Sequence, residues 1–146
     1  MAGLDDFANR MSRISVEVEG GVERAVKDCA VAVTRTVIDA TPVDTGRARS
    51  NWTAELDQAF QTLFPAHVPG VKGSTATANA EIAIGNAEAV IEQFDISKNG
   101  SIHISNGLPY IGALNDGHST QAPVDFVKLA VIDGLATIRN AKILKD

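Results

Sequence analysis

Asp44-Thr45-Gly46 is the tripeptide in which aspartic proteases carry their catalytic carboxylate. That chemistry needs two carboxylates that share a proton at close range, each in a loop that follows a buried strand. Here the tripeptide follows a helical pattern that Pro42 ends, and Arg47 stands where such a loop has a small residue. A turn is the better interpretation: Pro42 fixes the backbone, the Asp44 side chain caps the turn, and Gly46 takes a left-handed conformation. A dimeric aspartic protease that uses Asp44 is the enzymatic alternative.

A second cluster, Asp116, His118 and Ser119, contains the three residue types of a hydrolase triad. A working triad draws these groups together from separate parts of a fold, because neighbours in sequence rarely point so that the histidine bridges nucleophile and acid. A loop histidine with a hydrogen bond is the better interpretation of His118. The three histidines show no spacing of paired metal ligands, and Cys29 is the only cysteine. We therefore expect no catalytic residue, no metal and no cofactor.

Composition and charge limit the class of protein. The chain has 146 residues, 45% of them hydrophobic and 21% charged, as in one globular domain that spans residues 1–146. Acidic residues near the N-terminus and the lack of an apolar run of membrane-spanning length predict a soluble, unprocessed chain made in the cytoplasm. The net charge of -5 repels phosphate and anionic lipid. Arg47 and Arg49 form one compact basic pair, and the acidic background favours a protein partner for it over DNA.

Apolar residues predict a long N-terminal helix. From Leu4 to Val37 they recur at steps of three and four, which indicates a helix over residues 4–39 with one buried face. Gly20-Gly21 weakens this pattern midway and favours a kink or break there. After Gly46, small or apolar residues alternate with polar ones, which predicts a strand over residues 47–56 with Trp52 on its buried side.

The second half of the chain alternates loops with shorter elements. Two prolines and two glycines predict a loop, which an alanine-rich helix follows. A short strand comes next, and we expect it to pair with the Trp52 strand. A helical turn closed by Gly117 and a last helix with Pro123 in its first turn complete the chain. These elements span residues 63–74, 76–94, 101–105, 109–115 and 123–140. The predicted fold class is α+β: a long N-terminal helix and two further helices packed on a small, mainly antiparallel sheet.

Two segments together resemble a known family. "ATPVDTGRARSNW" and the later "LPYIGALNDGHSTQAPVDFVKLAV" are similar, in order and separation, to segments of the tail-component family of long-tailed double-stranded DNA bacteriophages. The resemblance extends from the first helix through the last. The first motif contributes Pro42, Asp44, Thr45, Gly46, Arg47 and Trp52, and the second contributes Tyr110, Leu114, Gly117, His118, Ser119, Gln121 and Pro123.

The resemblance implies a structural virion protein without enzymatic activity. It implies a minor tail or neck component that completes the tail and helps join it to the head, as a ring around the DNA channel. Its partners would be other neck and tail proteins, such as the terminator, stopper or connector, with DNA only as passing cargo, and it would be assembled in the host cytoplasm. A tail terminator, a head-completion stopper or adaptor, and a DNA-contacting channel protein are the alternatives. We expect Asp44 and Gly46 to shape the turn, and Arg47 and His118 to contact a partner.

Overall fold

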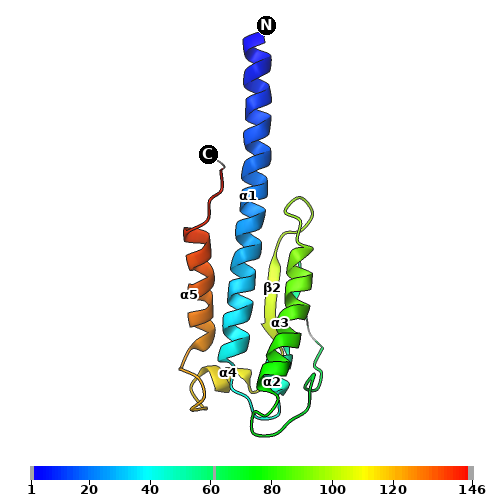
Figure 1. Ribbon diagram of the computed structural model, residues 1–146, viewed down its shortest axis with the longest axis vertical. Helices are drawn as coiled ribbons and strands as arrows, with labels where there is room; N and C mark the ends of the chain where they lie inside the picture. Colours follow the sequence, from blue (N-terminus) through cyan, green and yellow to red (C-terminus); the bar gives the residue numbers. More distant parts are fainter. Residues whose placement is uncertain (1, 61, 145–146) are drawn as a thin grey trace.

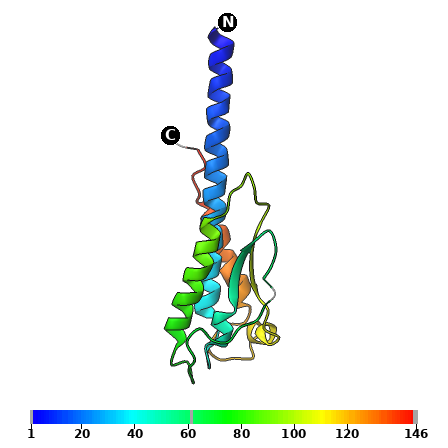
Figure 2. The same cartoon turned by 90° about the vertical axis from the view of Figure 1, so that its right-hand side faces the viewer.

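One long helix dominates the computed structural model, which describes residues 2–60 and 62–144 (Figure 1). This helix, α1 (Ala2–Ala40), confirms the predicted N-terminal helix. Its second half packs into the body of the molecule, whereas residues 3–20 are exposed and extend beyond the other helices and the sheet in both views (Figures 1 and 2). The prediction of a buried face along the whole stripe is therefore wrong for the first half of α1.

The predicted break at Gly20-Gly21 is also wrong, because α1 continues through both glycines. The C-terminal segment explains why Gly21 has no side chain. A Cβ atom at Gly21 would lie 2.3 Å from the carbonyl oxygen of Ile143, well inside contact distance. This glycine serves the close approach of two backbones, and that packing offsets the weaker helix propensity of glycine.

Two helices flank the second half of α1, one on each side (Figure 1). α5 (Phe126–Arg139) packs most extensively against α1, and α3 (Ala76–Glu92) packs on the other side. α5 comes very close at Gly134, where a Cβ atom would lie 2.3 Å from Cγ2 of Val33. The main core cluster lies between these elements and consists of Val37, Ile38, Trp52, Ala80, Ala83, Phe126 and Ala130. No described helix combines the length and hydropathy that a membrane crossing requires.

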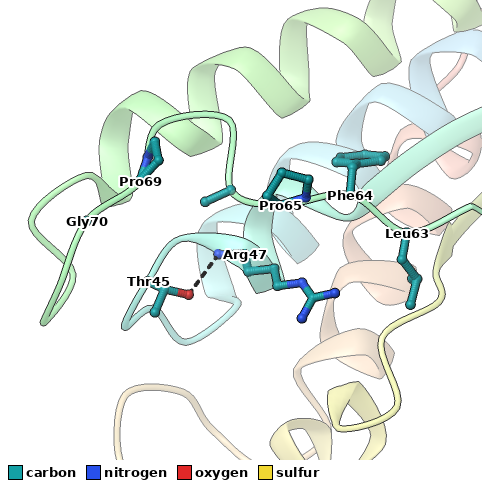
Figure 3. A pocket seen from close by; sticks show the side chains of 8 residues that line it. Thr45, Arg47, Leu63, Phe64, Pro65, Pro69 and Gly70 are labelled. Carbon is teal, nitrogen blue, oxygen red and sulfur yellow. Dashed lines mark hydrogen bonds between the residues drawn. The ribbon is translucent and has the colours of Figure 1, made fainter.

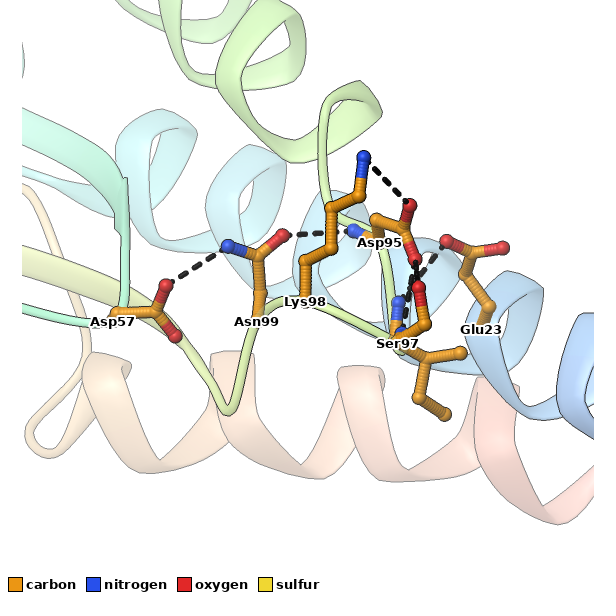
Figure 4. A network of polar contacts seen from close by, with 7 residues as sticks. Glu23, Asp57, Asp95, Ser97, Lys98 and Asn99 are labelled. Atoms are coloured by element: carbon orange, nitrogen blue, oxygen red, sulfur yellow. Dashed lines mark hydrogen bonds and ion pairs between the residues drawn. The ribbon is translucent and has the colours of Figure 1, made fainter.

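The sheet consists of two antiparallel strands, as predicted. β1 (Trp52–Leu56) pairs with β2 (Ile102–Asn106), in a register that joins Trp52 to Asn106. The turn before β2 is held by side chains (Figure 4): Asn99 Nδ2 donates to Asp57 Oδ2 at 2.8 Å, and Asn99 Oδ1 accepts from Asp95 N at 2.9 Å. With 55% helix and 7% strand, the fold class is α+β.

Some predicted element bounds are wrong. Residues Arg47–Ser50 form a helical turn, α2, where a strand was predicted, because Ser50 N and Ser50 Oγ both donate to the carbonyl of Gly46. The last helix begins at Phe126 instead of Pro123, since Asp125 has a φ of 60° and donates its N–H to the Asn115 carbonyl. α4 (Ile111–Asn115) and the left-handed Gly117 that follows it confirm the predicted turn, and residues 63–74 form no helix or strand where the structure describes them.

Candidate functional site

The two motif segments, far apart in sequence, meet around one hollow of about 380 Å³. It lies where α2 and α4 approach each other, at the end of the molecule opposite the N-terminus (Figure 1). Its lining residues are Pro42, Val43, Asp44, Thr45, Gly46, Arg47, Ala48, Tyr110, Leu114, His118, Ser119 and Gln121. Most predicted motif residues are thus brought together, whereas Trp52, Gly117 and Pro123 do not line this hollow.

Gln121 joins the second motif to the first through two hydrogen bonds. Its Oε1 accepts a hydrogen bond from Val43 N at 2.8 Å, and its Nε2 donates to Val43 O at 3.1 Å. The side-chain amide therefore satisfies both backbone groups of Val43, as a paired strand would do. Ser119 supports this arrangement, because its Oγ accepts from the backbone N–H of Gln121 at 3.2 Å.

The turn at Gly46 rests on a buried asparagine that sequence reasoning missed. Gly46 has a φ of 89°, and a Cβ atom there would lie 2.1 Å from Asn79 Nδ2. Asn79 is fully buried in α3, and its Oδ1 accepts from Ser50 Oγ at 2.9 Å and from Val68 N at 2.8 Å. Its Nδ2 donates to the carbonyls of Val68 and Thr75 at 2.8 and 2.9 Å. Asn79 thus joins α2, α3 and the loop before α3. No specific signal in the sequence indicated this role, because the alanine-rich helix also contains Asn86.

Asp44 holds the same loop from the other side. Its Oδ1 accepts from Lys72 N at 2.8 Å, and its carbonyl accepts from Gly73 N at 2.9 Å. The carboxylate therefore caps the loop at residues 70–75 instead of the turn that contains it. A proteolytic carboxylate would share a proton with a second carboxylate, whereas this one accepts a backbone N–H of its own chain.

The two arginines of the basic pair have different surroundings. All three guanidinium nitrogens of Arg49 donate to backbone carbonyls, Nε to Thr41 at 3.0 Å, Nη1 to Ala76 at 3.3 Å and Nη2 to Asp39 at 2.8 Å. Burial lowers the pKa of Arg49, which is consistent with a guanidinium enclosed by the fold. Arg47 is exposed, and within the described residues its guanidinium has no hydrogen bond or ion pair. The expectation that both arginines lie on a strand is wrong, because both belong to α2.

Arg47 also borders a second hollow, of about 480 Å³ (Figure 3). The lining of this hollow is mostly apolar and comes from α2, the turn before it and the loop before α3. Its residues are Thr45, Arg47, Leu63, Phe64, Pro65, Ala66, Pro69 and Gly70. Asn51 fixes that loop, since its Nδ2 donates to Phe64 O at 2.8 Å and its Oδ1 accepts from Phe64 N at 3.1 Å. The exposed guanidinium therefore stands between two preformed hollows.

The second motif contains two exposed side chains and a glycine that shapes the backbone. His118 is exposed, and Tyr110 is 42% exposed at the N-terminus of α4. Gly117 has a φ of 93°, which lets the chain reverse after α4. In the described part of the chain, no hydrogen bond joins the side chains of Asp116, His118 and Ser119, and the histidine, cysteine and acidic residues form no cluster that could hold a metal ion. The geometry thus provides side chains for contact and gives no support to a triad.

Trp52 belongs to the core beneath the motif. It is 7% exposed, and its Nε1 donates to Thr41 Oγ1 at 2.8 Å. Thr41 is fully buried at the end of α1 and donates in turn to Val37 O at 2.6 Å. These bonds join α1 to β1, so the aromatic residue of the first motif supports the turn from within the core.

A comparison with protein families gives a match over most of the chain. A family model described as "Bacteriophage HK97-gp10, putative tail-component" matches residues 5–117, which include the first motif and the second through Gly117. No curated protein and no solved structure matches the chain. Since the family match covers most of the sequence, the chain belongs to the HK97-gp10-like family of bacteriophage tail components.

Proposed function

We propose that the chain is a tail-completion protein, which finishes the phage tail and helps join it to the head through contacts with neighbouring proteins. Membership of a tail-component family supports a structural role in the tail. The observation that carries the finer proposal is the meeting of both motifs around one open hollow. Groups that could do chemistry there, such as Asp44, already bond to the backbone of the chain itself. Arg47, Tyr110 and His118 remain exposed at its edge. We name these three residues, together with the two hollows, the motif surface.

The motif surface suits a protein partner with an acidic and an apolar part. Arg47 offers a guanidinium fork to a carboxylate, and that pair would be partly enclosed by the hollows on either side. Leu63, Phe64 and Pro65 line the apolar hollow, where an aliphatic side chain of the partner would be desolvated. A small number of such anchor residues supplies most of the free energy of a typical protein interface.

Within the virion, we propose that copies of the chain form a ring around the DNA channel. The terminator, stopper or connector would be the neighbours, and the particle would be assembled in the host cytoplasm. The net charge of -5 supports DNA as passing cargo, because a ring with this charge would not hold the phosphate backbone. A tail terminator or a head-completion stopper or adaptor is the alternative within the same region of the virion.

The enzymatic alternative is a dimeric aspartic protease that uses Asp44. The hydrogen bond from Lys72 N to Asp44 Oδ1 argues against it, since it ties the carboxylate to a loop. Asp44→Asn separates the two roles. A protease would lose all turnover. In the structural role, the asparagine would keep an acceptor oxygen for Lys72 N in the loop at residues 70–75, and the chain would lose no more than about 1 kcal/mol of stability.

Electron microscopy of particles produced without this chain tests the proposed function. DNA-filled heads beside separate tails of normal length are the expected result. Tails of uncontrolled length would instead indicate a terminator, and heads that have lost their DNA would indicate a stopper. Intact infectious particles would contradict a structural role in the neck or tail.

A further inference from the structure

The first half of α1 carries an apolar stripe that nothing in the described chain covers. Residues 3–20 are all exposed, and Figure 2 shows this part of the helix extending beyond the other helices and the sheet, with the C-terminal segment beside its end. A lone helix of this length is marginally stable in water, and most helical stability in proteins comes from a packed apolar face. The stripe consists of Leu4 (63% exposed), Phe7 (57%), Met11 (48%), Ile14 (44%) and Val18 (37%).

This stripe continues the face of α1 that α5 and the C-terminal segment cover. The covering segment runs antiparallel to α1, because the residues that it meets come in reverse order along the chain. Gly21 lies against Ile143, Val33 lies against Gly134, and Thr36 Oγ1 donates to Asp133 at 3.1 Å. Steps of three and four residues lead along α1 from these covered positions back to Val18. A further antiparallel segment would therefore extend a packing arrangement that the molecule already uses.

The spacing of the stripe matches a coiled coil. Its intervals are three, four, three and four residues, a strict heptad with Leu4, Met11 and Val18 at position a and with Phe7 and Ile14 at position d. Apolar side chains repeated in this way pack against a helix with the same heptad repeat. The same segment of a second copy of the chain is such a helix. We propose that residues 7–18 of two copies of this chain pair as a two-stranded antiparallel coiled coil.

Charge selects the orientation and the register of this pair. In an antiparallel pair, position a of one helix faces position d of the other, and residues at position g face each other. With Met11 opposite Ile14 of the second copy, Arg10 faces Glu17 of the second copy, and the twofold axis repeats this ion pair. A shift by one heptad places Arg10 opposite Arg10, or Glu17 opposite Glu17. A parallel pair places Arg10 opposite Ser15 instead.

Side-chain size and the shape of the molecule also fit this register. On the other edge of the seam, Ala8 faces Ser15 of the second copy, and two small side chains let the helices approach closely. In this register Phe7 pairs with Val18 of the second copy, and the seam ends there. Leu4 comes opposite Gly21 of the second copy, which Ile143 already covers, so Leu4 lies outside the seam. The two bodies then lie at opposite ends of the pair. The motif surface, at the far end of each molecule, is left open in this pair (Figure 1). Since the two motif surfaces point in opposite directions, the pair belongs to the free protein and not to the ring.

Oligomeric state in solution tests the pairing. We expect sedimentation equilibrium of the full chain to give a dimer, and Ile14→Ser to raise the dimer dissociation constant at least about tenfold, since the pair buries this side chain twice. Val16→Ser is the matched control, because Val16 is 70% exposed and lies on the opposite face of α1. A wild-type chain that stays monomeric, or equal effects of both substitutions, would overturn the proposal.

A charge swap tests the register. Arg10→Glu and Glu17→Arg should each weaken the dimer by about threefold or more, because each places like charges opposite each other twice. The double substitution should restore the dissociation constant to within about twofold of the wild-type value. Failure of the double substitution to restore the dimer would overturn the antiparallel register. These results do not depend on the role of the motif surface in the tail.

Discussion

Substituting Gly46 by alanine tests how the first motif is built. Two costs arise at this position. A φ of 89° is unfavourable for any residue with a Cβ atom, and that atom would lie 2.1 Å from Asn79 Nδ2. Gly73 provides a matched control, because its φ is 74° while the nearest atom to its Cβ would be Val43 O at 3.4 Å. Gly73→Ala therefore has the backbone cost without a severe overlap.

The magnitudes follow from these contacts. The left-handed conformation costs about 1–2 kcal/mol for alanine, which is the whole effect expected for Gly73→Ala. At Gly46 the overlap must also displace the Asn79 amide from buried partners, at about 1–3 kcal/mol for a lost buried hydrogen bond, so Gly46→Ala should cost about 2–5 kcal/mol. Asn79→Ala leaves Val68 N without its partner and should cost a similar amount. The double substitution should fall short of the sum by about 1–3 kcal/mol, because Asn79→Ala removes the atom that the new Cβ meets.

Urea unfolding followed by tryptophan fluorescence measures these free energies, since Trp52 is the only tryptophan and is buried. The cycle requires four proteins: the wild-type chain, each single variant and the double variant. Costs of Gly46→Ala and Asn79→Ala that add within about 0.5 kcal/mol would refute the packing of this turn against the amide. Equal costs for Gly46→Ala and Gly73→Ala would refute it as well.

Two other predictions concern single side chains. A hydrogen bond from Asn99 and one from the Gly100 N–H lower the pKa of Asp57. The ionised carboxylate therefore stabilises the fold at pH values above its unfolded-state pKa. This stabilisation is lost as pH falls through the lower folded-state pKa, below about pH 4. Asp57→Asn should flatten the dependence of the urea midpoint on pH in that range, and an unchanged profile would count against this assignment. Arg49→Ala removes donors to three backbone carbonyls and should cost about 1–3 kcal/mol, whereas Arg47→Ala should change stability by less than about 0.5 kcal/mol. Thermal unfolding of both variants compares them, and a larger loss for Arg47→Ala would contradict the structural role of Arg49 and the contact role of Arg47.

Local patterns predicted most of the elements. Steps of three and four gave α1, and turn signals gave the pairing of β1 with β2 and the left-handed Gly117. The helical turn Arg47–Ser50 was not predicted, because small and polar residues alternate there as in a strand. Hydrogen bonds from Ser50 to the Gly46 carbonyl stabilise the helical conformation instead. A local pattern holds no information about such competition from the surrounding structure.

Tertiary contacts explain what the sequence could not predict. An apolar stripe shows which face of α1 avoids water but not what covers it, so the exposed segment at residues 3–20 appeared only in the structure. The buried role of Asn79 and the different surroundings of Arg47 and Arg49 depend on segments brought together from far along the chain. The meeting of the two motifs at one hollow likewise depends on how α4 is placed against α2.

The most direct test of the motif surface is the amount of chain built into virus particles. Particles would be produced without the natural chain and supplied with the Arg47→Glu variant or with the charge-reversal control Arg139→Glu, which lies in the last turn of α5. Immunoblots of purified particles, alongside infectious titre, measure the outcome. We expect Arg139→Glu to be incorporated like the wild-type chain, and Arg47→Glu to be absent from particles, leaving heads and tails separate. Normal incorporation and titre for Arg47→Glu would contradict the assignment of this surface as the contact to the tail neighbour.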